Sequence, residues 1–411
     1  MQKTTQILHP AYQAPPGYAA VQTGVFKAST IIFPDTASMR ARYADELGQQ
    51  YTYGTKGTPS TFVLEEQLCA LEGGRYCCLV PSGLAAIALV NLSLLKAGDE
   101  VLIPNNAYGP GIVLAQHELA QFGIRYQLYD ALNPADLAAK INAATKLVWL
   151  EAPGSVTMEF PDLLGLLRIC KSHNVLTALD NTWGAGLAFK PFEFHQEHTS
   201  DGVGGVGGVD VSVHALTKYP SGGADVLMGS VITQSDELHA LIKRCHMRLG
   251  YSVGINDIEF VLRSLHTMPL RYAAHDHAAR ALATWCQAQS PIVQVLHPAL
   301  AQSPGHGHWQ SICTNASGQS FAAGLFSVMV DDRYTSKHVD AFCDALQLFK
   351  LGYSWGGPLS LVMPYHLRGM REGKWPKHLK EGHLIRFSIG LEDIHDLQRD
   401  LEQAMQKTLG V

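Results

Sequence analysis

The sequence predicts an α/β protein with a large domain built on a mainly parallel sheet, a smaller α/β domain at the C-terminus and an extended arm at the N-terminus. Between about residues 58 and 265, short β-branched, apolar runs alternate with helical patterns. This alternation is typical of a parallel sheet covered by helices on both faces. Residues 1–57 are rich in Pro, Gly, Tyr and Thr with weak periodicity, which indicates the arm. Residues 266–411 begin with a long helical stretch and continue as mixed strand and helix, which indicates the second domain.

Seven apolar runs are expected to form the strands of the large domain. They are residues 77–81, 100–104, 124–128, 147–151, 175–179, 209–213 and 228–233. Helical patterns fit between them, for example at residues 84–95 and 162–173. Sheets of this kind bind ligands at the carboxyl ends of their strands. The residues that directly follow these runs are therefore the first candidates for a functional site.

The composition is that of an ordinary globular protein. The chain has 411 residues, of which 46% are hydrophobic, and a net charge of −5. This length suffices for two or three domains, and the charge argues against a nucleic-acid-binding surface. The N-terminus lacks the apolar core of a signal peptide, and no run of about 18 apolar residues predicts a membrane span. A cytoplasmic protein without a membrane partner is expected.

The cysteines and histidines give no sign of a disulfide framework or a metal site. The eight cysteines include no Cys-x-x-Cys pair, and the adjacent Cys77 and Cys78 lie in an apolar run that is expected to be core. Residues 195–208, which contain His195 and a Gly/Val-rich stretch after His198, are interpreted as a flexible insertion. The segment 306–308, His-Gly-His, is expected to lie in a surface loop rather than to bind a metal.

Lys218 and Asp180 are the most informative residues of the chain. Asp180 directly follows the strand predicted at 175–179, and Lys218 lies shortly after the one predicted at 209–213. This is what pyridoxal 5'-phosphate (PLP) needs, because an amine links to the aldehyde of the cofactor and a carboxylate keeps its ring nitrogen protonated. Alone, the lysine reads as a solvated side chain near a helix cap, and Asp-Asn as a turn. The pair indicates a PLP site only when the other residues of such a site are also present.

Further candidates follow other predicted strands in the chain. Ser82, Gly83 and Leu84 open a helical pattern, where backbone N–H groups suit a phosphate, although Ser-Gly is also a good helix cap. Thr217 adds a hydroxyl beside the lysine. Tyr108 follows the strand at 100–104, and its ring suits offset stacking on a pyridine; a surface tyrosine in a turn is the alternative.

Arg386 lies in the otherwise apolar run 384–390. A charged residue in such a run is costly unless it is paired. The planar guanidinium matches a carboxylate with two hydrogen bonds. Arg386 is therefore the candidate for binding the α-carboxylate of an amino-acid substrate, with an ion pair to a protein carboxylate as the alternative.

With these residues in place, the chain resembles the Cys/Met-metabolism family of PLP-dependent enzymes, and within it the bacterial cystathionine β-lyase branch. The resemblance runs from about Tyr51 to the end. The segments Gly-Ser-Val-Thr-Met-Glu at 154–159 and Ser-Trp-Gly-Gly at 354–357 favour the β-lyase branch. The matching segments are 53–59, 71–74, 106–108, 151–159, 180–183, 217–219, 353–357 and 386–393.

The resemblance implies the PLP-dependent transferase fold of type I and a β-elimination that converts L-cystathionine to homocysteine, pyruvate and ammonia. It also implies a role for each matching residue. Lys218 would carry PLP and move protons, Asp180 would pair with the ring nitrogen, and Tyr108 would stack on the ring. The remaining cofactor residues would be Ser82, Gly83, Leu84 and Thr217 at the phosphate, and the substrate carboxylate would meet Arg386, Ser354 and Trp355.

The arm would complete a neighbouring site, because the resemblance implies a homotetramer of two dimers with shared active sites. Tyr53 would reach the phosphate in a neighbouring subunit. The family usually has an arginine where this chain has Thr55, with Lys56 beside it as a substitute charge. Reactions at the γ-carbon (cystathionine γ-lyase, γ-synthase, methionine γ-lyase), cysteine desulfhydration and a non-catalytic binding protein remain alternatives.

Overall fold

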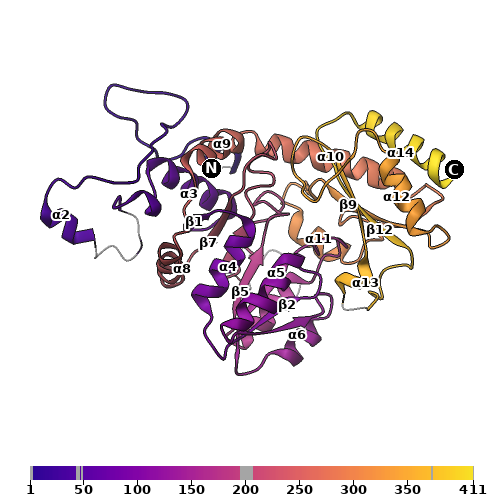
Figure 1. The fold of residues 1–411 in the computed structure, drawn as a ribbon, viewed down its shortest axis with the longest axis horizontal. Coiled ribbons are helices and arrows are strands. Elements are labelled where there is room, and N and C mark those ends of the chain that lie inside the picture. The colour runs from indigo at the N-terminus through magenta and orange to yellow at the C-terminus, as the bar shows by residue number, and fades with distance from the viewer. Residues whose placement is uncertain (1–2, 43–46, 48–49, 195–206, 372–373, 411) are drawn as a thin grey trace.

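A computed structural model describes the whole chain except residues 1–2, 43–46, 48–49, 195–206, 372–373 and 411. Most of the segment 195–208, with His195 and His198, lies outside the described residues. Figure 1 shows the arm projecting at one end, the C-terminal sheet and its helices at the other, and the large domain between them.

The large domain contains a seven-stranded sheet with the order β1-β7-β6-β5-β4-β2-β3. β7 runs antiparallel to both of its neighbours, and the other adjacent pairs are parallel, so the prediction of a mainly parallel sheet is confirmed. Each predicted strand overlaps an observed one. The bounds are β1 Tyr76–Val80, β2 Glu100–Pro104, β3 Arg125–Tyr129, β4 Thr145–Glu151, β5 Leu176–Asp180, β6 Val211–His214 and β7 Gly229–Thr233.

Most strands of this sheet are buried on both faces, which explains their apolar runs, whereas the edge strand β3 is partly exposed and carries polar residues. Side chains alternate between the faces with a period of two. In β1, Cys77 and Leu79 join one hydrophobic core, and Cys78 and Val80 join the other. The helices of this domain are α3 Pro59–Glu72, α4 Gly83–Leu94, α5 Gly109–Leu114, the π-helix η3 Ala115–Leu119, α6 Pro134–Lys140, α7 Leu163–Ser172, α8 Asp236–Leu249 and α9 Ile255–Leu265.

Two of these helices begin where the sequence predicts a start. The hydroxyl of Ser82 accepts a hydrogen bond of 3.0 Å from the backbone N–H of Ala85 at the start of α4. Asp162 accepts one of 2.9 Å from Gly165 at the start of α7. Short polar side chains satisfy N–H groups that the first turn of a helix leaves unpaired.

The second domain contains a five-stranded sheet with the order β10-β11-β12-β9-β8. In β12, Ile385 and Phe387 point into the core of this domain, while Leu384 belongs to the core shared with the large domain. Arg386 shares the face of Leu384 because side chains alternate along a strand. The elements are α10 Met268–Cys286, β8 Ile292–Leu296, α11 His306–Cys313, β9 Leu325–Val330, α12 Ser336–Ala345, β10 Lys350–Leu351, β11 Leu361–Tyr365, α13 Leu367–Met370, β12 His383–Ser388 and α14 Ile394–Leu409.

The arm carries α1 Lys3–Gln6, α2 Thr36–Ala41 and the short helix η2 Gly54–Lys56. It is tied to the large domain through Ser60, whose hydroxyl accepts from Phe26 N–H and donates to the Gly24 carbonyl. Val21 and Ile32 on the arm are 100% and 91% exposed. The predicted domain boundaries fall between η2 and α3 and between α9 and α10, and these boundaries stay predictions.

One local expectation is wrong, because residues 306–308 begin α11 instead of forming a loop. Gly305 caps that helix with a positive φ of 80°, and the His306 ring donates to the Pro298 carbonyl. Among the described residues, no group of three or more His, Cys, Asp or Glu is arranged to hold a metal ion. The eight cysteines are free, and Cys77 and Cys78 are buried. Within the described part of the chain, none of the helices has the length and apolar character needed to cross a bilayer.

Candidate active site

Lys218 lies in the loop after β6, at the carboxyl edge of the large sheet. Its Nζ donates a hydrogen bond of 2.9 Å to Ser354 Oγ and lies 5.3 Å from the centre of the Trp355 ring. Burial lowers the pKa of Lys218 to about 8, and the charge of Arg386 acts in the same direction while that of Asp180 opposes it. With this pKa about one tenth of the amine is uncharged at pH 7, far more than for an ordinary lysine, and a nucleophile or base requires this form.

Tyr219, the next residue, fixes the lysine loop to the second domain. It is fully buried, and its hydroxyl accepts a hydrogen bond of 2.8 Å from the backbone N–H of Gly324. Its ring lies 4.7 Å from that of Tyr272 and 5.5 Å from that of Trp355. The position of the lysine thus depends on packing between the two domains.

Asp180 ends β5 and is held by its own turn. The backbone N–H and hydroxyl of Thr182 donate to Asp180 Oδ1 at 3.0 and 2.5 Å, and Ala215 N–H donates to that hydroxyl at 2.9 Å. Burial raises the pKa of Asp180, and the two hydrogen bonds from Thr182 oppose this effect. The carboxylate is thus partly compensated within the protein and suited to a cationic partner.

Glu151 is a site residue that the sequence reasoning did not assign. It ends β4 and is the direct register partner of Asp180. Its Oε2 accepts a hydrogen bond of 2.7 Å from Tyr108 N–H. Burial raises its pKa well above the usual range, and the charge of Asp180 adds to the effect. Two features of the sequence could have identified Glu151 as a site residue: it ends a predicted strand, and it lies in the matching segment 151–159.

Tyr108 forms the N-terminal boundary of α5 and is 42% exposed. It lines a small pocket together with Glu151 and Asp180. Burial raises the pKa of the phenol, followed by the charges of Asp180 and Glu151. The hydroxyl therefore stays protonated at neutral pH, and an exposed ring beside a carboxylate is available for stacking.

The start of α4 packs closely against the loop that leads to Lys218. A Cβ on Gly83 would lie 2.6 Å from the Cβ of Ala215, and one on Gly229 would lie 2.4 Å from the Ser82 carbonyl oxygen. Both positions therefore require glycine. Leu84 lines a cavity of about 810 Å³ with the segment after β2.

Two predicted phosphate contacts are engaged within the protein. The Ser82 hydroxyl caps α4. The Thr217 hydroxyl bonds the backbone of Met228, accepting at 3.1 Å and donating at 3.3 Å. The phosphate roles of Ser82, Thr217 and the Gly83–Leu84 backbone stay predictions.

Arg386 is 6% exposed and lies beside the lysine segment. Its Nη2 donates a hydrogen bond of 2.7 Å to the Tyr353 carbonyl, and its guanidinium carbon lies 5.2 Å from the Tyr365 ring centre. Among the described residues it forms no ion pair with a protein carboxylate, so the alternative interpretation from the sequence has no support here. A buried, otherwise unpaired guanidinium suits a substrate carboxylate.

Tyr53 and Lys56 are not brought to this cluster within the single chain. Tyr53 is 48% exposed and forms an isolated bridge with Thr30 of the arm. The Lys56 carbonyl accepts a hydrogen bond of 3.3 Å from Lys243. Their assignment to a neighbouring subunit stays a prediction.

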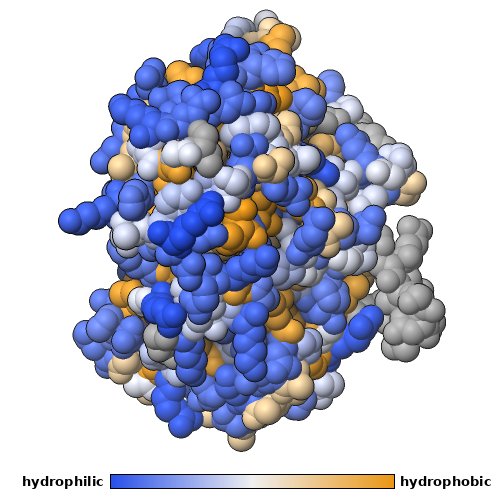
Figure 2. Space-filling model, turned by 90° about the vertical axis from the view of Figure 1, so that its right-hand side faces the viewer, coloured by the Kyte–Doolittle hydropathy of each residue, from blue (hydrophilic) through white to orange (hydrophobic). Residues whose placement is uncertain are grey.

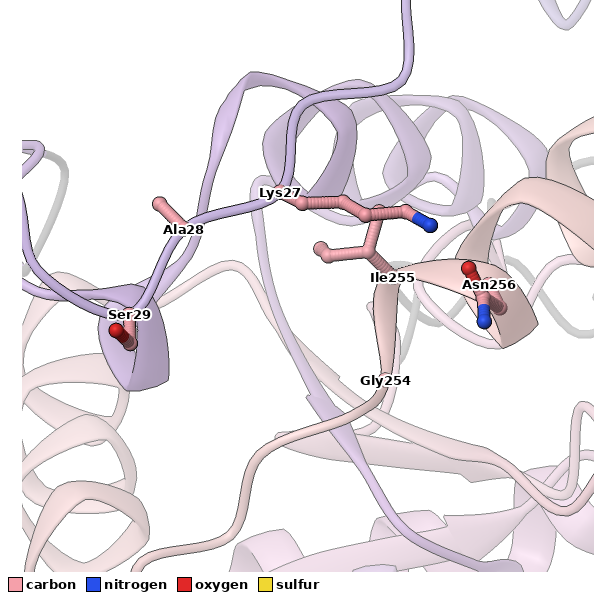
Figure 3. Close-up of a pocket in the computed structure, with 6 residues that line it drawn as sticks. All are labelled: Lys27, Ala28, Ser29, Gly254, Ile255 and Asn256. Atoms are coloured by element: carbon pink, nitrogen blue, oxygen red, sulfur yellow. The ribbon is translucent and has the colours of Figure 1, made fainter.

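A separate cavity of about 440 Å³ lies where the arm crosses the start of α9 (Figure 3). Lys27 extends along it toward Asn256, and Ile255 lies beneath. Lys27 is the charged member of its lining, which contains none of the residues discussed above. The space-filling view of the opposite, C-terminal end is mainly hydrophilic with small apolar patches (Figure 2).

The side chains at the lysine cluster fit PLP on their own chemistry. Lys218 has a lowered pKa, Asp180 offers a carboxylate, and Gly83 lets a helix N-terminus pack against the lysine loop. An amine, an acidic partner for a ring nitrogen and a site for an anion are the three features that PLP requires.

Known proteins give the same answer. Residues 4–406 match the family described as Cys/Met metabolism PLP-dependent enzyme. The chain is 36% identical to a cystathionine β-lyase from Bordetella avium, over 95% of this chain and 93% of the relative. It is 32% identical to an L-alanine/L-glutamate racemase from Wolbachia pipientis, over 93% of this chain and 92% of the relative.

Solved structures agree with the fold. A cystathionine γ-synthase from Xanthomonas oryzae, in complex with aminoacrylate and cysteine, has a TM-score of 0.85 and 27% identity, covering 100% of this chain and 99% of that one. The chain therefore belongs to the Cys/Met metabolism family of PLP-dependent enzymes, and the prediction of a PLP-dependent lyase is confirmed.

Proposed function

We propose that this member of the family is a cystathionine β-lyase, which converts L-cystathionine and water to L-homocysteine, pyruvate and ammonia. The observation that carries the proposal is the contact of Lys218 with Ser354 and Trp355, because that segment favours the β-lyase branch. The similarity to the Bordetella avium enzyme supports the same reading.

Lys218 is the proton-transfer residue of the proposed reaction. When bound, PLP supplies an electron sink that makes the Cα proton of an attached amino acid acidic. Lys218 takes that proton, the Cβ–S bond breaks, and Lys218 returns the proton to the leaving sulfur. A pKa of about 8 suits both steps, since the amine and the ammonium form are each accessible near neutral pH.

The other residues bind and orient. Arg386 receives the α-carboxylate, with the Ser354–Trp355 backbone beside it. Asp180 would pair with the protonated ring nitrogen of bound PLP, and Tyr108 would hold its ring by stacking. Glu151 fixes the backbone of Tyr108, so it sets where that ring can lie. Holding the substrate and the cofactor ring in one geometry lowers the entropic part of the activation barrier.

Product analysis tests the reaction. Purified enzyme is incubated with L-cystathionine, and the keto acid and thiol are identified by mass spectrometry. Pyruvate with homocysteine supports β-elimination, whereas 2-oxobutyrate with cysteine identifies the γ-cleaving alternative. L-cysteine, a thiol, and L-methionine, a thioether, serve as competing substrates. No product from any of them, with alanine or glutamate racemised instead, overturns the proposal in favour of the activity named for the Wolbachia relative.

The assembly and location form part of the same proposal. A homotetramer of two dimers in the cytoplasm would bury the apolar side chains that the arm exposes, such as Val21 and Ile32. It would also give Tyr53 and Lys56 a cofactor phosphate to meet. Light scattering of the purified enzyme gives the mass, and a monomer that is fully active would contradict the shared site.

A further inference from the structure

Glu72, the last residue of α3, is a fully buried carboxylate that contacts Asn181, the residue after Asp180. Three side chains donate to it: Ser212 Oγ at 2.5 Å, His214 Nδ1 at 2.8 Å and Asn181 Nδ2 at 3.4 Å. A buried carboxylate is tolerated when it is hydrogen-bonded in this way. The donors come from the end of β5 and from β6.

These donors lie next to the two residues on which the chemistry depends. Asn181 directly follows Asp180, and Asp180 pairs in register with Val213, the neighbour of His214. The backbone N–H of Asn181 donates to the Val213 carbonyl at 2.9 Å. Glu72 thus joins the strand end that carries Asp180 to the strand that leads into the Lys218 loop.

His214 supplies a second observation. Its side chain has no exposed surface, and its Nε2 has no hydrogen-bond partner among the described residues. Burying an imidazole nitrogen without a hydrogen-bond partner destabilises the fold. Histidine is therefore a poor choice for a purely structural role at this position. The ring acts electrostatically on Asp180: its charge lowers the pKa of that carboxyl, whereas the charge of Glu72 raises it.

We propose that Glu72 and His214 are positioning residues for Asp180, and that the pair fixes the carboxylate at the site of the cofactor ring nitrogen. They do not touch substrate, and they act through Asp180 alone. The proposal rests on PLP dependence but not on which thioether is cleaved. Its test therefore uses cofactor binding, which is independent of the β-lyase assignment.

The test is a double-mutant cycle on the intact enzyme, with the dissociation constant of PLP and the visible absorbance of the bound cofactor as readouts. Glu72→Gln keeps the shape but replaces an accepting oxygen by an N–H donor. It is expected to weaken PLP binding about tenfold, by analogy with residues that orient a ligand-binding side chain. In an Asp180→Asn background the same substitution is expected to weaken it no further, because coupled residues are not additive.

His214 provides the matched rescue. His214→Phe removes the donor and is expected to weaken PLP binding and shift the absorbance. His214→Asn places an amide N–H near the position of Nδ1 and is expected to recover most of both. Asp400→Asn is the control, since Asp400 is a buried carboxylate that accepts from the N–H groups of Gln347 and Leu348 in the second domain.

The outcomes separate the proposal from a general loss of stability. Equal PLP affinity in Glu72→Gln and wild type would overturn it. A loss of PLP affinity in Glu72→Gln that is fully additive with that of Asp180→Asn would also overturn it. The same holds if Asp400→Asn, with the same melting temperature as Glu72→Gln, loses as much PLP affinity. If the enzyme binds PLP as expected but cleaves another substrate, the function proposed above fails while this inference stands.

Discussion

Lys218 Nζ and Ser354 Oγ are joined by a hydrogen bond of 2.9 Å across the two domains. Lys218 belongs to the loop after β6, and Ser354 lies between β10 and β11 of the second sheet. The Lys218 amine is therefore held from the side on which Arg386 is proposed to bind substrate. The direction in which the amine points is set by the second domain.

Ser354→Ala should lower kcat about tenfold or more with a smaller effect on KM. The removed bond involves an ionisable amine, and such bonds contribute about 1.5–3 kcal/mol. Steady-state kinetics with L-cystathionine measure the effect. Ser311→Ala on α11, which removes another hydroxyl bonded within its helix, is the control. An equal fall in that variant would argue against a role for the bond.

Lys218→Ala should abolish turnover and the covalent attachment of the cofactor. No other lysine amine is expected to take its place, because the reaction needs the amine at this strand end. Intact-protein mass spectrometry after borohydride reduction shows whether PLP is attached. Lys146→Ala, at an exposed lysine of β4, should leave both unchanged. Retained activity in Lys218→Ala would remove the assignment.

Cofactor capture by the apoenzyme should accelerate as pH rises toward about 8 and then level off. Burial depresses the pKa of the Lys218 amine to about 8, and the neutral form that attacks the aldehyde increases as pH rises through that value. Stopped-flow absorbance of PLP binding at a series of pH values gives the profile. A midpoint near the ordinary lysine value would show that the amine is solvated.

Arg386→Ala should lower kcat/KM by roughly 10- to 100-fold, because two charge-assisted hydrogen bonds to the substrate carboxylate are lost. Arg386→Lys should recover only part of this, since an ammonium lacks the planar fork. Kinetics with both variants measure the change. Arg368→Ala, whose guanidinium is exposed, is the control. An unchanged kcat/KM would transfer the carboxylate site to another residue.

The sequence predicts the strands of the large domain well because burial on both faces forces continuous apolar runs. The positions of Asp180 at the end of β5 and of Lys218 in the loop after β6 follow from the same pattern, since both lie at the carboxyl edge of the sheet, and their roles toward a cofactor stay predictions. The contacts of Glu72 were not, because a glutamate at a helix end does not reveal which strands it faces. Arg371, which contacts the carbonyl of Asn105 266 positions away, shows the same limit. The start of α11 at His306 was missed because Gly307 resembles a loop residue.

Tyr219 connects the Lys218 loop directly to the packing between the two domains. Its hydroxyl accepts a hydrogen bond from the backbone N–H of Gly324 in the second domain, and its backbone directly follows Lys218. Heating or denaturant that loosens the second domain is therefore expected to disturb the lysine loop while the seven-stranded sheet is still folded. The enzyme should lose activity before its circular dichroism changes. Catalytic rate is therefore expected to report loss of packing between the two domains earlier than secondary structure does.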